Sequence, residues 1–196
     1  MNETIEIKRS NVLASYEEAR KAGANGYMQF LENLFGKELF KPKDVRDRVK
    51  TFEDACCELG DEHPFVQAYT TWVLHEEHDD QTDITAYLKL RIICAALNEG
   101  WVPQFTEDEE RFFPCCWLYD RREVDEMSDD EKNEGRMTNT CGYQTEYVFF
   151  AYSYSYRASS YSNTIGTRLC LKSKELAEYC GKQFIDILAD FLLIRK

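Results

Sequence analysis

Long apolar runs are missing from this chain of 196 residues. No stretch approaches the roughly 20 apolar residues that a helix needs to cross a bilayer. The most apolar segment, residues 184–194, is interrupted by Asp186 and Asp190. The N-terminal residues also lack the basic and then apolar pattern of a secretion signal. We therefore expect no membrane segment and no export, which leaves the reducing cytoplasm as the expected compartment.

Nucleotide-binding glycine motifs of the P-loop or G-x-G-x-x-G type are also missing. The chain has eight cysteines but no C-x-x-C pair, although zinc sites usually take ligands two to four residues apart. Cys94, Cys170 and Cys180 fall in apolar patterns, where a free thiol behaves as a small hydrophobic group. The sequence therefore predicts reduced thiols and no cofactor.

Histidine is scarce, with three in the chain. On a helix, His75 and His78 would share one face, and Asp79 and Asp80 could add oxygen ligands. An exposed helix end rich in polar residues explains the same cluster, and we favour that interpretation. Zinc chemistry would need a further ligand, and the remaining histidine is His63. We predict no metal site and no catalytic residue, with His75 and His78 as the candidates if a metal does bind.

Lys and Arg are absent from residues 51–83, which carry ten carboxylates. Residues 106–135 carry twelve carboxylates against four basic residues, and the whole chain has a net charge of −12. Such a field repels phosphate backbones and attracts basic proteins, so it argues against direct nucleic-acid binding. The alternative is ordinary solvated surface. The candidate acidic surface residues are Asp79, Asp80, Glu107, Asp108, Glu109, Asp129 and Asp130.

Apolar residues at helical spacing run through the first hundred residues. Ser10 and Thr51 are placed to cap two of the predicted helices. The strongest pattern, over about residues 82–98, is apolar around most of the cylinder and predicts a central helix. We place an N-terminal helical segment at residues 1–50 and the main domain at residues 51–196.

The pattern changes to strands in the second half. Residues 112–119 are strand-like but contain Pro114, which indicates a sheet edge or a bend. Residues 146–156 alternate between two faces, and residues 165–171 alternate again, so we predict a β-hairpin over about residues 146–171. A helix that Ser173 caps follows. The predicted fold is α+β: a helical N-terminal half and a small antiparallel sheet covered by the C-terminal helix.

A tract rich in Tyr and Ser covers residues 151–163. Tyr supplies a large amphipathic contact area and Ser adapts its hydrogen bonds, a mixture that recognition loops favour. The alternative is an ordinary hairpin with one aromatic face packed on the helices. The candidate binding residues of this region are Tyr152, Tyr154, Tyr156, Tyr161 and Arg168.

Three segments have amino-acid sequences that are distinctive enough to compare with a known family: residues 51–55, residues 86–109 and residues 166–186. They resemble a family of uncharacterised proteins encoded by phages and prophages of gut Bacteroidetes, and the similarity spans most of residues 45–192. The chain departs from that family at Cys115 and Cys116, where an aromatic run usually follows the proline. The resemblance implies a phage setting, in the host cytoplasm or the virion, and brings no catalytic residues.

Our leading hypothesis is a non-enzymatic phage-encoded accessory protein that binds a host or phage protein. The tyrosines would supply contact area, and the acidic stretches would attract a basic partner. Two alternatives stay open: a structural virion component, and a metal-dependent enzyme that uses His75 and His78.

Overall fold

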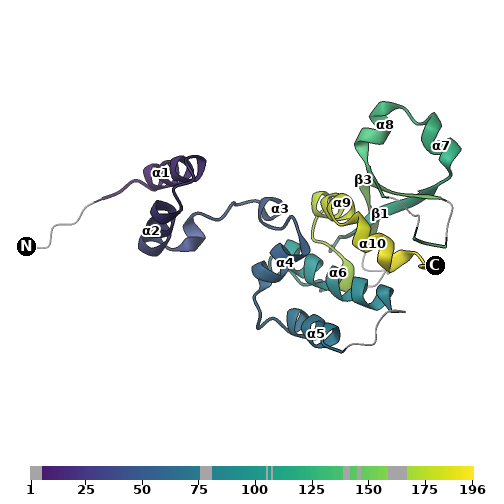
Figure 1. The fold of residues 1–196 in the computed structure, drawn as a ribbon, viewed down its shortest axis with the longest axis horizontal. Helices are drawn as coiled ribbons and strands as arrows, with labels where there is room; N and C mark the ends of the chain where they lie inside the picture. The colour runs from purple at the N-terminus through teal and green to yellow at the C-terminus, as the bar shows by residue number, and fades with distance from the viewer. Residues whose placement is uncertain are drawn as a thin grey trace, which may run out of the picture. The chain divides into compact units, whose positions relative to one another are not determined.

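The structure of this protein is a computed structural model that describes residues 6–75, 81–104, 106, 108–138, 142–144, 147–158 and 167–196, with the backbone alone for residues 149–158 and 167. The chain divides into two compact units, Met1–Asp44 and Val45–Lys196. Figure 1 shows the course of the chain through both units. The predicted boundary, between residues 50 and 51, falls a few residues later in the chain.

The first unit is a pair of helices followed by a single 3-10 turn: α1 (Arg9–Lys21), α2 (Asn25–Phe35) and η1 (Lys37–Leu39). Its buried apolar side chains are Val12, Ala19 and Leu31. The Tyr16 hydroxyl donates a hydrogen bond to Glu32 at 2.5 Å. The predicted cap at Ser10 is wrong, because α1 already begins at Arg9 and has no side-chain cap.

The second unit begins with four helices: α3 (Val45–Arg48), α4 (Phe52–Leu59), α5 (Pro64–Val73) and α6 (Thr82–Asn98). The predicted central helix is confirmed, since α4, α5 and the C-terminal helix α10 (Ile185–Leu192) all pack against α6. The predicted cap at Thr51 is also confirmed: its hydroxyl accepts from the Asp54 backbone N–H, and the Asp54 carboxylate accepts from the Thr51 N–H. This reciprocal capping box satisfies two backbone donors at the start of α4.

The sheet has three antiparallel strands in the order β1-β3-β2, formed by β1 (Arg111–Tyr119), β2 (Arg136–Thr138) and β3 (Val148–Ala158). Two short helices connect β1 to β2: α7 (Arg121–Glu126) and α8 (Asp129–Glu134). Ser128 and Glu131 form a reciprocal capping box at the start of α8. Pro114 lies in an edge strand, at the point where the register with β3 shifts.

The chain ends with a 3-10 turn and two helices: η2 (Thr167–Leu169), α9 (Lys174–Gln183) and α10 (Ile185–Leu192). Ser173 caps α9 as predicted, but the single predicted helix is broken at Phe184. In Figure 1 the two helices lie between the sheet and α6, and the contacts agree, because α9 packs on β1 and β3 while α10 packs on α6. The α+β fold with a helical first half is confirmed.

The predicted hairpin over residues 146–171 is wrong in its second strand. The first strand is present as β3, but it pairs with β1 and β2. Thr167–Leu169 forms η2, and Leu171 makes an isolated bridge to Phe112 of β1. The reason is that Leu169, Cys170 and Leu171 are all buried, so the apparent alternation does not separate an inner from an outer face. β3 instead finds partners that are distant in sequence.

Candidate functional site

One face of the sheet lies against the C-terminal helices, and side chains of β2 identify it. Arg136 donates to the backbone carbonyls of Lys182 and Gln183 at 3.1 and 3.3 Å, and Thr138 donates to Asp186. Successive side chains of a strand point to opposite faces. Met137, between Arg136 and Thr138, therefore belongs to the opposite face, which we call the outer face.

The outer face carries exposed apolar side chains. Met137 and Trp117 are both register partners of Phe150, and directly opposed residues of antiparallel strands share a face. The Trp117 side chain is 46% exposed and that of Met137 is 39% exposed. A Trp and a Met that are this accessible on one sheet face are typical of a contact surface, since both residue types are enriched in protein interfaces.

The connection from β1 to β2, residues 120–134, is acidic; we call it the acidic connection. It holds eight carboxylates and three basic residues. Asp120, Glu123 and Glu131 take part in the capping boxes of α7 and α8. The remaining carboxylates are exposed and make no ion pair with another described residue: Asp125, Glu126, Asp129, Asp130 and Glu134. Figure 1 shows the connection as an arc that leaves the sheet after β1 and returns at β2.

Within the described part of the chain, one edge of β1 is also left open for most of its length. At its beginning, Phe112 exchanges both backbone hydrogen bonds with Leu171, at 3.0 and 2.9 Å. The segment that precedes Leu171 turns into η2 and leaves the strand. Among the described residues, no other strand pairs with this edge of β1. We call residues 114–118 the open edge.

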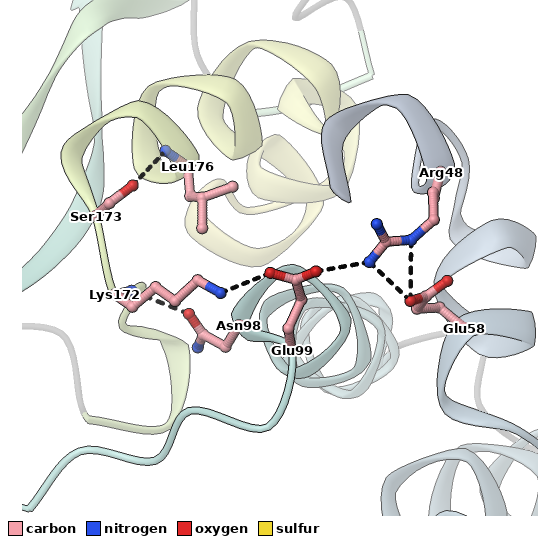
Figure 2. Close-up of polar contacts among 7 residues, drawn as sticks. All are labelled: Arg48, Glu58, Asn98, Glu99, Lys172, Ser173 and Leu176. Atoms are coloured by element: carbon pink, nitrogen blue, oxygen red, sulfur yellow. Dashed lines mark hydrogen bonds and ion pairs between the residues drawn. The ribbon is translucent and has the colours of Figure 1, made fainter. Parts of the chain in front are cut away.

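A polar network fixes the point where Leu171 meets β1, and Figure 2 shows its hydrogen bond between the Lys172 backbone and Asn98. The amide of Asn98 donates to the Cys170 carbonyl at 2.9 Å, and its oxygen accepts from the Lys172 backbone N–H at 3.0 Å. Because Asn98 is buried at the end of α6, these bonds hold the residues on both sides of Leu171 in place. Leu171 is therefore held in place, and the backbone pairing on this edge of β1 ends there.

The same network contains charged groups on four segments (Figure 2). The Glu99 carboxylate accepts from Arg48 at 2.7 Å and from Lys172 at 2.8 Å, and Arg48 also donates to Glu58 at 3.0 Å. These hydrogen bonds, first the one from Lys172 and then the one from Arg48, lower the pKa of Glu99. The cluster joins α3 and α4 to the end of α6, and its pairing identifies it as a structural brace.

The predicted acidic residues fall into different surroundings. Asp129 and Asp130 lie in the first turn of α8 and are exposed, as is Asp108. Glu109 corrects the prediction: its side chain is only 11% exposed and lies 3.8 Å from the buried Arg111. Pairing with a buried guanidinium removes Glu109 from the acidic surface. Three further candidates lie outside the described residues: Asp79, Asp80 and Glu107.

The structure places the backbone of the predicted tyrosines in β3. Residues 152–154 lie where the register shifts, opposite Cys115, and Tyr156 is the register partner of the buried Phe113. Tyr161 lies outside the described residues. Arg168 is exposed in η2. Tyr152 and Tyr154 thus share a sheet with Trp117 and Met137.

The candidate metal ligands are not assembled within the described part of the chain. His75 is exposed just after α5, and His78 lies outside the described residues. The Nδ1 atom of His63 accepts a hydrogen bond from the Phe65 backbone N–H at 3.2 Å and caps α5. No group of three or more His, Cys, Asp or Glu side chains in the described ranges is arranged to hold a metal ion.

Buried thiols line a small apolar cavity between β1, α6 and α10. Burial raises the pKa of Cys116 to about 12 and that of Cys170 to about 11. A hydrogen bond with Cys180, followed by burial, raises the pKa of Cys94 well above its usual value. Since the thiolate is the nucleophile, these cysteines are protonated and inert at neutral pH. The cavity lining is uncharged, so it offers a substrate nothing that would orient it.

Sequence reasoning missed the outer face, and of the open edge it predicted only that Pro114 marks a sheet edge or a bend. Trp117 lies in a short apolar run that also fits a core strand, and Met137 stands alone between Arg136 and Thr138. The order β1-β3-β2 puts them on one face, and no local pattern encodes that order. The signal that was available is Pro114, which indicates an edge strand.

Comparisons of the chain with protein-family models, with curated proteins and with solved structures gave no match. Among the described residues, no helix has both the length and the apolar character that crossing a membrane requires. The functional assignment therefore depends on the geometry of the sheet and its acidic connection.

Proposed function

We propose that this chain is a non-enzymatic binding protein whose outer face and acidic connection take up a basic partner protein. One observation carries the proposal. Exposed Trp117 and Met137 lie in β1 and β2, and the acidic connection starts after β1 and ends before β2, so it joins the two strands that carry them. Apolar side chains supply contact energy, and carboxylates attract and orient a cationic surface.

The charge pattern supports a partner of opposite sign. Five carboxylates of the acidic connection make no ion pair with another described residue, so no neighbouring cation neutralises their charge. A cluster of unpaired charges of one sign increases the association rate with a protein of opposite charge. The resemblance to proteins of phages and prophages suggests a host or phage protein as the partner, met in the host cytoplasm. The thiols of Cys94, Cys116 and Cys170 are inert, and the histidines among the described residues are not assembled into a metal site, which favours binding over catalysis.

Affinity capture with the full chain as bait tests the proposal. We expect capture of a basic protein from host lysate that weakens as NaCl rises from about 50 mM to about 500 mM, because salt screens exposed charges. The variant with Asp125→Asn, Glu126→Gln, Asp129→Asn and Asp130→Asn should capture at least about tenfold less partner at the lower salt concentration.

A matched variant makes the same change in net charge within the first unit, through Glu6→Gln, Glu17→Gln, Glu18→Gln and Glu38→Gln. It should capture the partner as the natural chain does. Equal losses in the two variants would show that net charge alone matters. Unchanged capture by the variant of the acidic connection would refute the proposed binding surface.

A further inference from the structure

The backbone of the open edge has hydrogen-bonding groups directed away from the sheet. Every second residue of an antiparallel strand directs its N–H and C=O to the same edge. Phe112 directs both groups to Leu171, so residues 114, 116 and 118 direct theirs to the same side. The register shift adds residues to β3, not to β1, and the alternation along β1 is therefore kept. Pro114 has no N–H, which leaves two donors and three acceptors.

The described residues start to cover this edge at Leu171 and then leave it. Leu171 pairs with Phe112, and the preceding residues Thr167–Leu169 curl into η2 instead of continuing opposite residue 114. An added strand would extend the line that Leu171 begins. Trp117 and Leu118 are 46% and 45% exposed and, as neighbours in a strand, they point to opposite faces. They can therefore contact an added strand from both sides.

We propose that the open edge binds an extended basic segment of the partner as an additional β-strand. In this recognition mode, backbone hydrogen bonds supply affinity, and alternate side chains supply specificity. The inference rests on the proposed function and deepens it, because it names the conformation and the chemistry of the bound segment. The segment has apolar or β-branched residues at its centre and Lys or Arg at its ends.

The charge around β1 favours a basic segment of a partner over a second copy of the chain as the occupant of the open edge. Both ends of β1 lie within residues 106–135, which hold twelve carboxylates and four basic residues. Pairing of two β1 edges would bring two such stretches together, and like charges at an interface are unfavourable. Pro114 removes one donor from the edge, and proline together with charge is the usual protection of an edge strand against self-association.

Synthetic peptides give the sharpest test, because N-methyl groups can be placed on chosen backbone amides. The probe is fluorescein-labelled Lys-Lys-Val-Thr-Val-Thr-Val-Lys-Lys, titrated with the full chain at about 50 mM NaCl and followed by fluorescence anisotropy. The matched control replaces each lysine with glutamate. We expect the lysine peptide to bind and the glutamate peptide to bind at least about tenfold more weakly.

Two N-methylated versions of the lysine peptide then report on strand pairing. One carries N-methyl groups on the three valines and the other on the two threonines, which removes the N–H donors of alternate residues. A paired strand directs one set to β1 and the other to solvent. One version should therefore lose at least about tenfold in affinity while the other stays within about twofold. Equal losses, or no binding of the lysine peptide at all, would overturn the inference.

A variant of the edge checks the same point on the protein side. Leu118→Pro removes one outward N–H, at an edge position that tolerates proline, and should weaken the lysine peptide at least about fivefold. Leu118→Ala, which keeps the N–H, should change the affinity by less than about twofold. Far-UV circular dichroism establishes that both variants are folded. The peptide comparison needs no variant, so it decides the matter if Leu118→Pro does not fold.

The outcomes separate this inference from the proposed function. If neutralising the acidic connection abolishes partner capture but the two methylation patterns have equal effects, the partner binds elsewhere than the open edge. If the natural chain is a dimer by analytical ultracentrifugation and Leu118→Pro is a monomer, the edge belongs to a second copy and the inference is overturned.

Discussion

At the residue scale, Glu99 combines an unfavourable backbone with favourable charge contacts. It ends α6 in the left-handed region, with φ 49°, where a residue with a side chain pays a steric penalty. Its carboxylate lies between Lys172 and Arg48. These two contacts explain why a glutamate stands where glycine would be more favourable for the backbone.

Stability should therefore depend on the ionisation of Glu99. Its pKa in the folded state is lowered by hydrogen bonds from Lys172 and Arg48, so its contribution is present above the unfolded pKa of about 4.3 and is lost as the pH falls through the lower folded value. Glu99→Gln should reduce the free energy of unfolding by about 1 kcal/mol at pH 7, a modest figure because the side chain is 38% exposed.

Urea unfolding of the natural chain and of Glu99→Gln between about pH 7 and pH 2.5 measures this effect. The difference between the two should shrink towards zero at the acid end, where Glu99 is protonated. Glu134→Gln, in the exposed acidic connection, is the control and should change stability by less than about 0.5 kcal/mol. A difference for Glu99→Gln that is independent of pH would contradict the role of its charge.

At the scale of elements, three helices begin with the same device but are packed differently. Capping boxes start α4, α7 and α8. The helix α4 packs against α6 and buries Ala55 completely, whereas α7 and α8 bury no residue. The cap of α4 is thus coupled to the core, and the cap of α8 is a local feature.

Removing the two hydroxyl caps should therefore have different consequences. Thr51→Ala should lower the global free energy of unfolding by about 1 kcal/mol. Ser128→Ala should leave it within about 0.3 kcal/mol and accelerate amide hydrogen exchange in α8 alone, because a helix without core contacts opens locally. Ser128→Thr, which keeps the hydroxyl, should retain the natural exchange rates. Similar global losses for Thr51→Ala and Ser128→Ala would show that α8 is coupled to the core after all.

At the scale of the whole molecule, the hydrophobic core belongs to the second unit. Every member of its main cluster lies at or beyond Val45, while the buried apolar residues of the first unit are Val12, Ala19 and Leu31. Val45 and Val49 belong to the large cluster and precede the boundary that the sequence indicated at residue 51. The two possible boundaries therefore differ in whether these valines are retained.

Two truncations distinguish the boundaries. Removal of residues 1–43 should leave the melting temperature of the remaining chain within about 3 °C of its value in the full chain, because the large cluster is intact. Removal of residues 1–50 also deletes Val45, Val49 and Arg48, and should lower it by at least about 6 °C. Differential scanning calorimetry measures both. A large loss on removal of residues 1–43 would mean that the first unit stabilises the second.

The sequence by itself determined the local features of this protein. Helical periodicity, the caps at Thr51, Ser128 and Ser173, and the strand pattern of residues 146–156 depend on residues close in the chain, and the structure contains the helices, the three caps and the strand β3. The acidic character of residues 106–135 also follows from composition alone. Tertiary structure decided how the strands pair, because a strand with one apolar face can pair with any strand of matching pattern.

That decision placed β3 between β1 and β2 and sent Leu171 to the start of β1. It also exposed Trp117 and left an edge beside it, and it placed the largely covered side chain of Glu109 against the buried Arg111. Each of these features depends on contacts between residues that are distant in sequence, or on the burial of a side chain. Burial in turn depends on which other segments of the chain pack against that side chain. The candidate surface was therefore visible only in three dimensions, whereas its charge was visible from the start.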